Sequence, residues 1–151
     1  RCCTSTAMAG PRAPEPSAEE TLSAVPRRVY RHRMITDDPT ITNPDHYRTL
    51  WENDHVRVLD YTDEPGDETT PHDHPNSVMV TLRHFSRLLS PGDRTFDTAL
   101  TTGQAVWLPA QRHSGKNTGA TPTHTLLIEL KGDAAGEPSS AHLGPEHPAA
   151  A

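Results

Sequence analysis

Residues 72–82 read HDHPNSVMVTL, a pair of histidines one residue apart that leads into a run rich in valine and threonine. β-branched residues favour extended backbone, so the run at 77–82 predicts a β-strand. Side chains at positions i and i+2 of an extended segment point to the same face, which would place His72 and His74 together. With 10 histidines in 151 residues, however, one such pair is expected by chance. A metal-binding strand edge and a polar turn are both open on this stretch alone.

Short β-type runs separated by turn signals extend over the middle of the chain. Beside 77–82, they lie at residues 55–61, 85–89, 94–100, 103–109 and 124–130. The tripeptide Pro91-Gly92-Asp93 predicts a hairpin turn, and only a turn near residues 45–52 is a candidate for helical structure. Regular short strands with glycine and proline turns predict an all-β sandwich or barrel.

Length and composition predict one folded domain with disordered ends. A chain of 151 residues has room for a single core, yet only 32% of its residues are hydrophobic and 15 are prolines. Small residues, prolines and charges dominate residues 1–40 and 132–151, which we expect to be a disordered leader or tail and a disordered C-terminal tail. The folded domain is therefore predicted at residues 41–131, and Met8 and Met34 are both candidate start residues.

The charge and the hydropathy of the chain argue against two classes of partner. A net charge of −6 disfavours nucleic acids and anionic membranes. No apolar run approaches the roughly 18 residues of a membrane span, and a basic-then-apolar signal layout is missing from the N-terminus. These features predict a cytoplasmic protein. Cys2 and Cys3 lie too close to the N-terminus to cross-link a core by a disulfide.

A third histidine could complete a metal site with the first two. His113 follows His74 by 39 positions and comes just after the strand predicted at 103–109. Three neutral imidazoles suit a divalent transition metal such as Fe, Zn, Ni, Mn or Cu, and they leave coordination positions open for water or a small-molecule substrate. The identity of the metal stays open.

The spacing of these residues resembles the two motifs of the cupin superfamily. In the first motif, Gly66 is followed by five residues and then by His72-Asp73-His74, as in cupins. The glutamate of that motif falls on Val78 or Met79, and its closing glycine is missing.

The second cupin motif is also half present. Gly103 is followed by five residues and Pro109, and His113 is followed by three residues and Asn117. Between Pro109 and His113, Gln111 stands where the motif has glycine, and the segment is one residue shorter than in the motif. The resemblance covers about residues 50–131, nearly the whole predicted domain.

The resemblance implies a cupin double-stranded β-helix, that is, a jelly-roll barrel of the RmlC-like kind. Without the glutamate, the site is similar to three-histidine cupins, some of which are metal-dependent dioxygenases that act on small organic acids. The wording of the motifs also resembles a bacterial group of small cupins that carry labels such as cytoplasmic protein or β-alanine degradation. Two other functions stay open, namely a non-catalytic module that binds a small ligand and a structural cupin without metal.

The same resemblance implies a homodimer that forms through strands or through the segment before Trp51. A core of about 90 residues is also marginal on its own. Four further residues are candidates to support the metal ligands or to contact a substrate: Gln111, Met79, Asn117 and Arg57. Catalytic residues stay unassigned. We expect four large apolar residues in the core, namely Phe85, Phe96, Trp107 and Leu108, and two histidines at the surface, His84 and His124.

Overall fold

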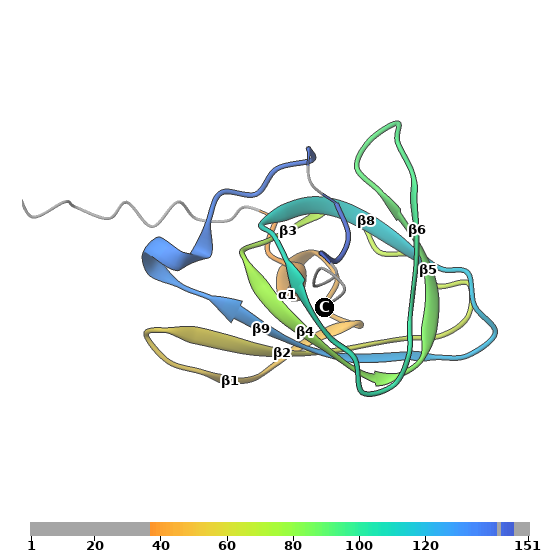
Figure 1. The fold of residues 1–151 in the computed structure, drawn as a ribbon, viewed down its shortest axis with the longest axis horizontal. Coiled ribbons are helices and arrows are strands. Elements are labelled where there is room, and N and C mark those ends of the chain that lie inside the picture. Colours follow the sequence, from red (N-terminus) through yellow and green to blue (C-terminus); the bar gives the residue numbers. More distant parts are fainter. Residues whose placement is uncertain (1–36, 142, 147–151) are drawn as a thin grey trace, which may run out of the picture. The chain divides into compact units, whose positions relative to one another are not determined.

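Antiparallel strands form two sheets around a common interior in this computed structural model, which describes residues 37–141 and 143–146 (Figure 1). The five-stranded sheet has the order β1 (Tyr47–Glu52), β2 (Val56–Asp63), β9 (Thr123–Leu130), β4 (Ser77–Arg83), β7 (Ala105–Leu108). The four-stranded sheet has the order β3 (His72–His74), β8 (Gln111–Asn117), β5 (Phe85–Ser90), β6 (Phe96–Leu100). Two short helices, α1 (Pro39–Thr42) and η1 (Gly132–Ala135), flank the strands.

The prediction of an all-β jelly roll is confirmed, although β1 and β8 were not predicted and β3 had been left open as a strand edge or a polar turn. The segment expected to form a turn near residues 45–52 is instead β1, which pairs with β2 in antiparallel register. The other missed strand is β8, which pairs with both β3 and β5. Its inward side chains are polar, so it lacks the apolar alternation that identifies a strand in a sequence.

Alternate residues of the strands build the core. In β9, positions 123, 125, 127 and 129 are buried, and the residues between them are partly exposed. The core cluster contains Phe85 and Leu108, as expected, together with Leu59, Leu127 and others from both sheets. The prediction was wrong for Phe96 and Trp107, whose exposed fractions are 39% and 36%. Trp107 points outward because β7 places its neighbours Val106 and Leu108 on the inner face.

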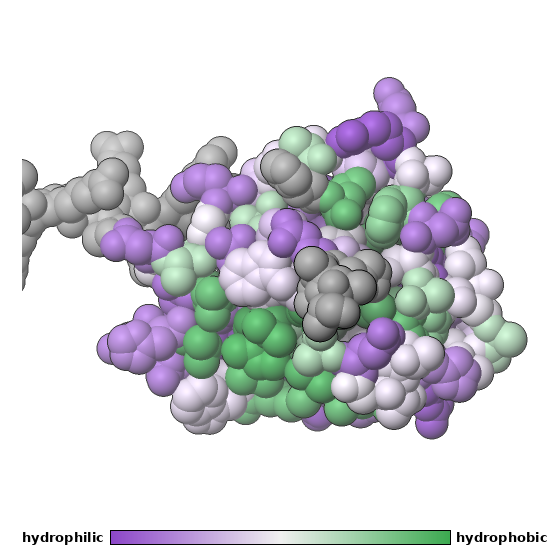
Figure 2. All heavy atoms as spheres, in the orientation of Figure 1, coloured by the Kyte–Doolittle hydropathy of each residue, from purple (hydrophilic) through white to green (hydrophobic). Residues whose placement is uncertain are grey.

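The outer face of the five-stranded sheet is unusually apolar. Strand register aligns one partly or fully exposed residue from each strand in a continuous row, in the order Trp51, Val58, Ile128, Val78, Trp107. Directly paired residues on neighbouring strands have their side chains on the same face, so these five form one apolar stripe. Figure 2 shows hydrophobic surface gathered in the lower half of the view, over the region of β2, β4 and β9.

Two glycines of the cupin-like motifs lie in turns that need them. Gly66 has a φ of 92° in the turn before β3, and Gly103 has a φ of 89° in the turn before β7. Side chains with a β-carbon rarely adopt this left-handed conformation. Both glycines therefore set the direction in which the chain enters a strand of the barrel.

The described residues after Lys131 also contact the barrel. Asn76 donates a backbone hydrogen bond to Ala135, and the backbone amide of Glu146 donates to Trp107. The predicted disordered segment 1–40 lies almost entirely outside the described residues, as do residues 142 and 147–151 of the predicted tail. The boundaries at residues 41 and 131 stay predictions. Within the described residues, no helix is long and apolar enough to cross a membrane, and the cytoplasmic location likewise stays a prediction.

Candidate metal centre

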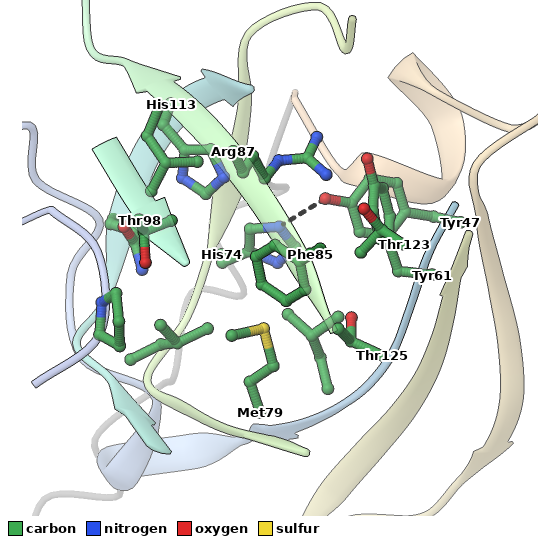
Figure 3. Close-up of a pocket in the computed structure, with 15 residues that line it drawn as sticks. Tyr47, Tyr61, His74, Met79, Phe85, Arg87, Thr98, His113, Thr123 and Thr125 are labelled. Atoms are coloured by element: carbon green, nitrogen blue, oxygen red, sulfur yellow. Dashed lines mark hydrogen bonds between the residues drawn. The ribbon is translucent and has the colours of Figure 1, made fainter. Parts of the chain in front are cut away.

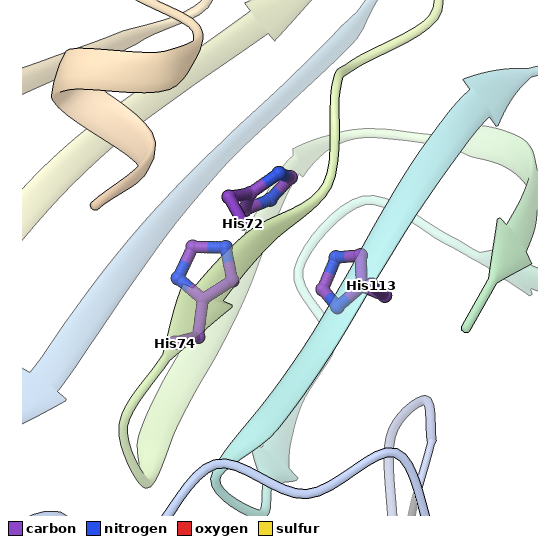
Figure 4. Close-up of side chains that lie close together, drawn as sticks. All are labelled: His72, His74 and His113. Carbon is purple, nitrogen blue, oxygen red and sulfur yellow. The ribbon is translucent and has the colours of Figure 1, made fainter. Parts of the chain in front are cut away.

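Three buried histidines converge on one point inside the barrel, from two neighbouring strands (Figure 4). His72 and His74 come from β3, and His113 comes from β8, where it is the register partner of His72. One ring nitrogen from each histidine lies within 4.8 Å of the corresponding nitrogens of the other two. The structure thus brings together the three residues that the sequence proposed, because antiparallel pairing of β3 with β8 places all three on the inner face.

Hydrogen bonds fix the tautomers of two of these rings. His72 Nδ1 lies 2.6 Å from the Thr70 carbonyl oxygen, and His74 Nδ1 lies 2.7 Å from the Glu129 carboxylate. Since both partners are acceptors, we assign the proton to Nδ1 in each ring. The Nε2 atoms of His72 and His74 are then lone-pair donors, as metal ligation requires.

A chain of charged side chains stands behind His74. Glu129 comes from β9, is almost fully buried and also binds Arg57, with a shortest nitrogen–oxygen distance of 2.6 Å. Arg57 in turn binds Asp38 at 2.7 Å. Burial lowers the pKa of Arg57, but the carboxylates of Glu129 and Asp38 outweigh this effect, so the pKa is raised overall. A carboxylate on the far nitrogen of a ligating histidine orients the ring and increases its basicity.

The histidine cluster has more hydrogen-bond acceptors than donors. The Tyr47 hydroxyl lies 3.1 Å from His72 Nε2 and 3.4 Å from His74 Nε2, but it has only one proton to donate. His113 Nδ1 is buried and finds no hydrogen-bond partner among the described residues. Buried polar atoms are rarely left unpaired in native proteins. A cation among these nitrogens would supply the missing partner, so the residues present fit a transition-metal ion.

His72 and His113 resist protonation. Burial, followed by the nearby His74, lowers the pKa of His72 to about 3. Burial also lowers the pKa of His113 well below its usual value, with further lowering by the other two histidines. Protons compete with a metal for imidazole nitrogen. These rings are therefore neutral, and available to a metal, well below neutral pH.

A small pocket of about 50 Å³ borders the cluster (Figure 3). His74 and His113 line it, as do several apolar side chains that include Phe85 and Leu108. Met79, one of the predicted supporting residues, also lines the pocket and is 9% exposed. Because Met79 points inward, its neighbour Val78 points outward. The glutamate of the first cupin motif therefore corresponds in space to Met79.

The predicted supporting residues Gln111 and Asn117 lie in different surroundings. Gln111 lines the pocket beside His74, its register partner, and its side-chain oxygen accepts a hydrogen bond from the backbone of Gly144. Asn117 lies apart from the histidines, and its side-chain amide donates to Asp63 and to the Thr121 carbonyl. These hydrogen bonds tie the loop that follows β8.

A second buried polar cluster lies around Asp63. Its carboxylate accepts hydrogen bonds from the side chains of Tyr61, Arg87 and Asn117 and from the backbone of Thr123. Burial raises the pKa of Asp63, but Arg87 and these hydrogen bonds outweigh it and leave the pKa lowered. Arg87 also lines the pocket and packs its guanidinium 4.6 Å from the centre of the Tyr61 ring.

Tyr47 and Glu129 were not predicted to belong to the site. Tyr47 precedes His72 by 25 residues and lies in the strand that the sequence did not reveal. Glu129 lies in a predicted strand whose more apolar face, with Leu126, Ile128 and Leu130, points outward, so periodicity favoured the wrong face. The only signal was the charge itself, since a carboxylate between Ile128 and Leu130 must be paired if it is buried.

One solved structure supports the fold, and two others match it more weakly. A cupin domain from Bordetella pertussis Tohama I matches with a TM-score of 0.54 and 26% identity, over 57% of this chain and 92% of that one. A double-stranded β-helix protein from Klebsiella pneumoniae matches at 0.47 and 22%, over 58% of this chain and 77% of that one. An RmlC-like cupin from Methanocaldococcus jannaschii matches at 0.46 and 13%, over 56% and 77%.

No protein-family model matches the sequence, and no curated protein matches it either. The two antiparallel sheets around a common interior and the match to the Bordetella cupin domain indicate the same architecture. The chain therefore folds as a small cupin domain of the RmlC-like, double-stranded β-helix type.

Proposed function

We propose that the protein binds one divalent transition metal per chain through His72, His74 and His113. The observation that carries the proposal is the surplus of buried acceptor nitrogens, which face one another inside 4.8 Å with one hydroxyl proton between two of them. Fe, Zn, Ni, Mn and Cu all accept imidazole ligands, and the donor set does not choose among them. An ion bound there would act as a Lewis acid or as a redox centre beside the pocket.

The test is the metal content of protein that is purified without an affinity tag and dialysed against a mild chelator. We expect about one ion per chain in the unmodified protein and a large loss in His74→Ala, because two imidazoles hold an ion poorly against solvent. His84→Ala is the matched control, since His84 is exposed in the connection between β4 and β5. Full occupancy in His74→Ala, or protein that takes up none of the five metals, would overturn the proposal.

A catalytic role for this metal centre is a finer proposal, namely a dioxygenase or a related enzyme that acts on a small organic acid. The pocket supports it because His74 and His113 lie in its wall and Arg87 adds a cationic group to the lining. Oxygen consumption by the iron-loaded protein, measured with a panel of small carboxylic acids, tests the proposal. Saturable binding of an acid without oxygen consumption would favour the alternative, a non-catalytic module that binds a small ligand.

We further propose that two copies associate through the outer face of the five-stranded sheet. The apolar stripe that runs from Trp51 to Trp107 crosses all five strands, and its central residues Ile128 and Val78 are direct register partners. A two-fold axis near that pair would pack the stripe against itself, as a closed dimer requires. Large exposed apolar patches on a protein surface mark interaction sites.

Sedimentation at tens of micromolar tests the dimer. We expect a dimer that Val78→Glu converts to a monomer without loss of metal, since Val78 points away from the histidines. Ser86→Glu places the same charge on an exposed position of the four-stranded sheet and should leave the dimer intact. A monomeric unmodified protein would exclude a second copy as the occupant of this face.

A further inference from the structure

The hydroxyl of Tyr47 occupies a position that the metal proposal leaves unexplained. Tyr47 is the one buried residue of β1, whose other residues are exposed. Its ring makes close contacts with both histidines of β3, at centroid distances of 5.2 Å to His72 and 5.4 Å to His74. Figure 3 shows the hydroxyl directed at His74 from the opposite side of the pocket. One strand thus sends a single side chain inward, to the point where the histidine nitrogens meet.

Packing holds this hydroxyl in place. The ring of Tyr47 lies 4.5 Å from the ring of Tyr61, its register partner on β2. The backbone amide of Tyr47 donates to the carbonyl of Asn43, whose side chain also lies 3.2 Å from His72 Nδ1. The same short segment therefore fixes the tyrosine and, through hydrogen bonds between Asn43 and Thr70, holds the carbonyl that accepts from His72.

The distances from the Tyr47 oxygen correspond to those between two ligands of one ion. With bonds of about 2.0–2.1 Å, two ligands of a tetrahedral ion lie roughly 3.3 Å apart. The hydroxyl oxygen lies 3.1 Å from His72 Nε2 and 3.4 Å from His74 Nε2. A hydrogen bond to either nitrogen alone would explain one of these distances but not both.

We propose that Tyr47 supplies the fourth protein ligand, through its phenolate oxygen, to the ion held by the three histidines. This inference rests on the proposed metal binding and deepens it. The phenol proton passes to solvent when the ion binds, and the anionic oxygen takes the place of the carboxylate that is missing at Met79. The fourth donor thus comes from a different strand than the cupin motif would predict.

Phenolate ligation has a spectroscopic signature that is independent of activity. Phenolate bound to Cu²⁺ gives a charge-transfer absorption in the visible, and imidazoles alone do not. Thiolates give a similar absorption, so all proteins in the experiment carry Cys2→Ser and Cys3→Ser. One equivalent of Cu²⁺ is added to the full-length, metal-free protein, and copper per chain is measured alongside the spectrum.

Tyr47→Phe should still bind one copper per chain but should lose the charge-transfer absorption and keep only the weak d–d absorption of Cu²⁺ bound by imidazoles. Tyr61→Phe is the matched control, because it also removes one buried hydroxyl, but that hydroxyl donates to Asp63. The chain has three tyrosines, and the third, Tyr30, lies outside the described residues. Tyr30→Phe combined with Tyr61→Phe leaves Tyr47 as the only tyrosine, and this variant should keep the absorption. It decides the question even if Tyr47→Phe does not fold.

The possible failures are distinguishable. If the reference protein binds copper without the charge-transfer absorption, the assignment of Tyr47 is overturned and metal binding is left intact. A charge-transfer absorption that persists in Tyr47→Phe has the same consequence. Loss of the charge-transfer absorption in the variant whose only tyrosine is Tyr47 also overturns the assignment and leaves metal binding intact. A reference protein that binds no copper, and no other transition metal, overturns the proposed function and this inference together.

Discussion

Two polar clusters are buried in the same barrel, and they differ in how completely their hydrogen bonds are satisfied. Around Asp63, one carboxylate receives four hydrogen bonds and an ion pair with Arg87. Around His74, three imidazoles face each other with acceptor nitrogens, and one of the buried nitrogens of His113 has no partner among the described residues.

The difference separates a structural cluster from a binding site. A buried charge whose hydrogen bonds are all made contributes rigidity and has no need of a ligand. Buried lone pairs without donors cost free energy unless a ligand fills the gap. Conformational stability should therefore depend most on the Asp63 cluster, and ligand affinity on the histidine cluster.

The largest effect on stability is expected for Asp63→Ala. The substitution leaves the guanidinium of Arg87 buried without its carboxylate, which typically costs about 3–5 kcal/mol. Urea denaturation of the metal-free protein measures the loss. The folded Asp63→Ala protein should still bind one metal per chain, because the histidines keep their own hydrogen-bond partners. A loss below about 1 kcal/mol would mean that the Asp63 cluster does not carry the stability of the barrel.

The two clusters should also lose stability over different ranges of pH. The pKa of His72 is about 3 in the folded state against 6.5 ordinarily, so the unfolded chain takes up the proton first as the pH falls. Stability is then lost from about pH 6.5 downward, by about 2 kcal/mol at pH 5 from His72 alone. His113 acts in the same direction. The lowered pKa of Asp63 adds a second loss only below its ordinary value of 3.8.

Denaturation of the metal-free protein between pH 7.5 and 3 would resolve the two ranges. The variant His72→Asn should lose the contribution of His72 to the decline that begins near pH 6.5, while the contribution of His113 and the part below pH 4 remain. Stability that is independent of pH between 7 and 5 would contradict the low pKa of the buried histidines.

A smaller effect is expected for Glu129→Gln, this time on metal affinity. The new amide oxygen could still accept a hydrogen bond from His74, but the negative charge behind the ring is lost. Replacing such partners usually weakens metal binding about ten- to a hundredfold. Competition with a chromophoric chelator measures the affinity for zinc. Glu52→Gln removes a charge from an exposed ion pair with Lys131 and is the control. Equal affinities in the two variants would show that the carboxylate does not tune His74.

The smallest effect is expected for His124→Ala. His124 and Arg48 both pair with Asp60 on the outer face of the sheet, and the side chain of His124 is 42% exposed. Partly exposed pairs of this kind contribute little, so the change in stability should stay below about 1 kcal/mol. Metal content should not change. A loss of metal in this variant would show that content follows general stability and not the three histidines of the cluster.

The sequence predicted the histidines more successfully than the residues around them. His72, His74 and His113 are recognisable because their spacing follows two motifs and because strand geometry places His72 and His74 on one face. Tyr47 and Glu129 follow no motif. They contact His74 from β1 and β9, at separations of 27 and 55 residues, and no local pattern encodes contacts of that range.

The sequence by itself determined the fold class, because short runs of β-branched residues between glycine and proline turns have few other solutions. It also identified the three histidines of the cluster. His72 and His74 share a face because they stand at i and i+2 of a strand, and the spacing of the second motif identifies His113. Only the tertiary structure decided which face of β9 is inside, because the more apolar face, with Leu126, Ile128 and Leu130, points outward and periodicity alone favours the wrong face. The same holds for β8, whose inward residues Gln111, His113 and Asn117 are all polar. Pairing with β3 and β5 buries these side chains. Hydrogen bonds to distant residues compensate the burial of Gln111 and Asn117.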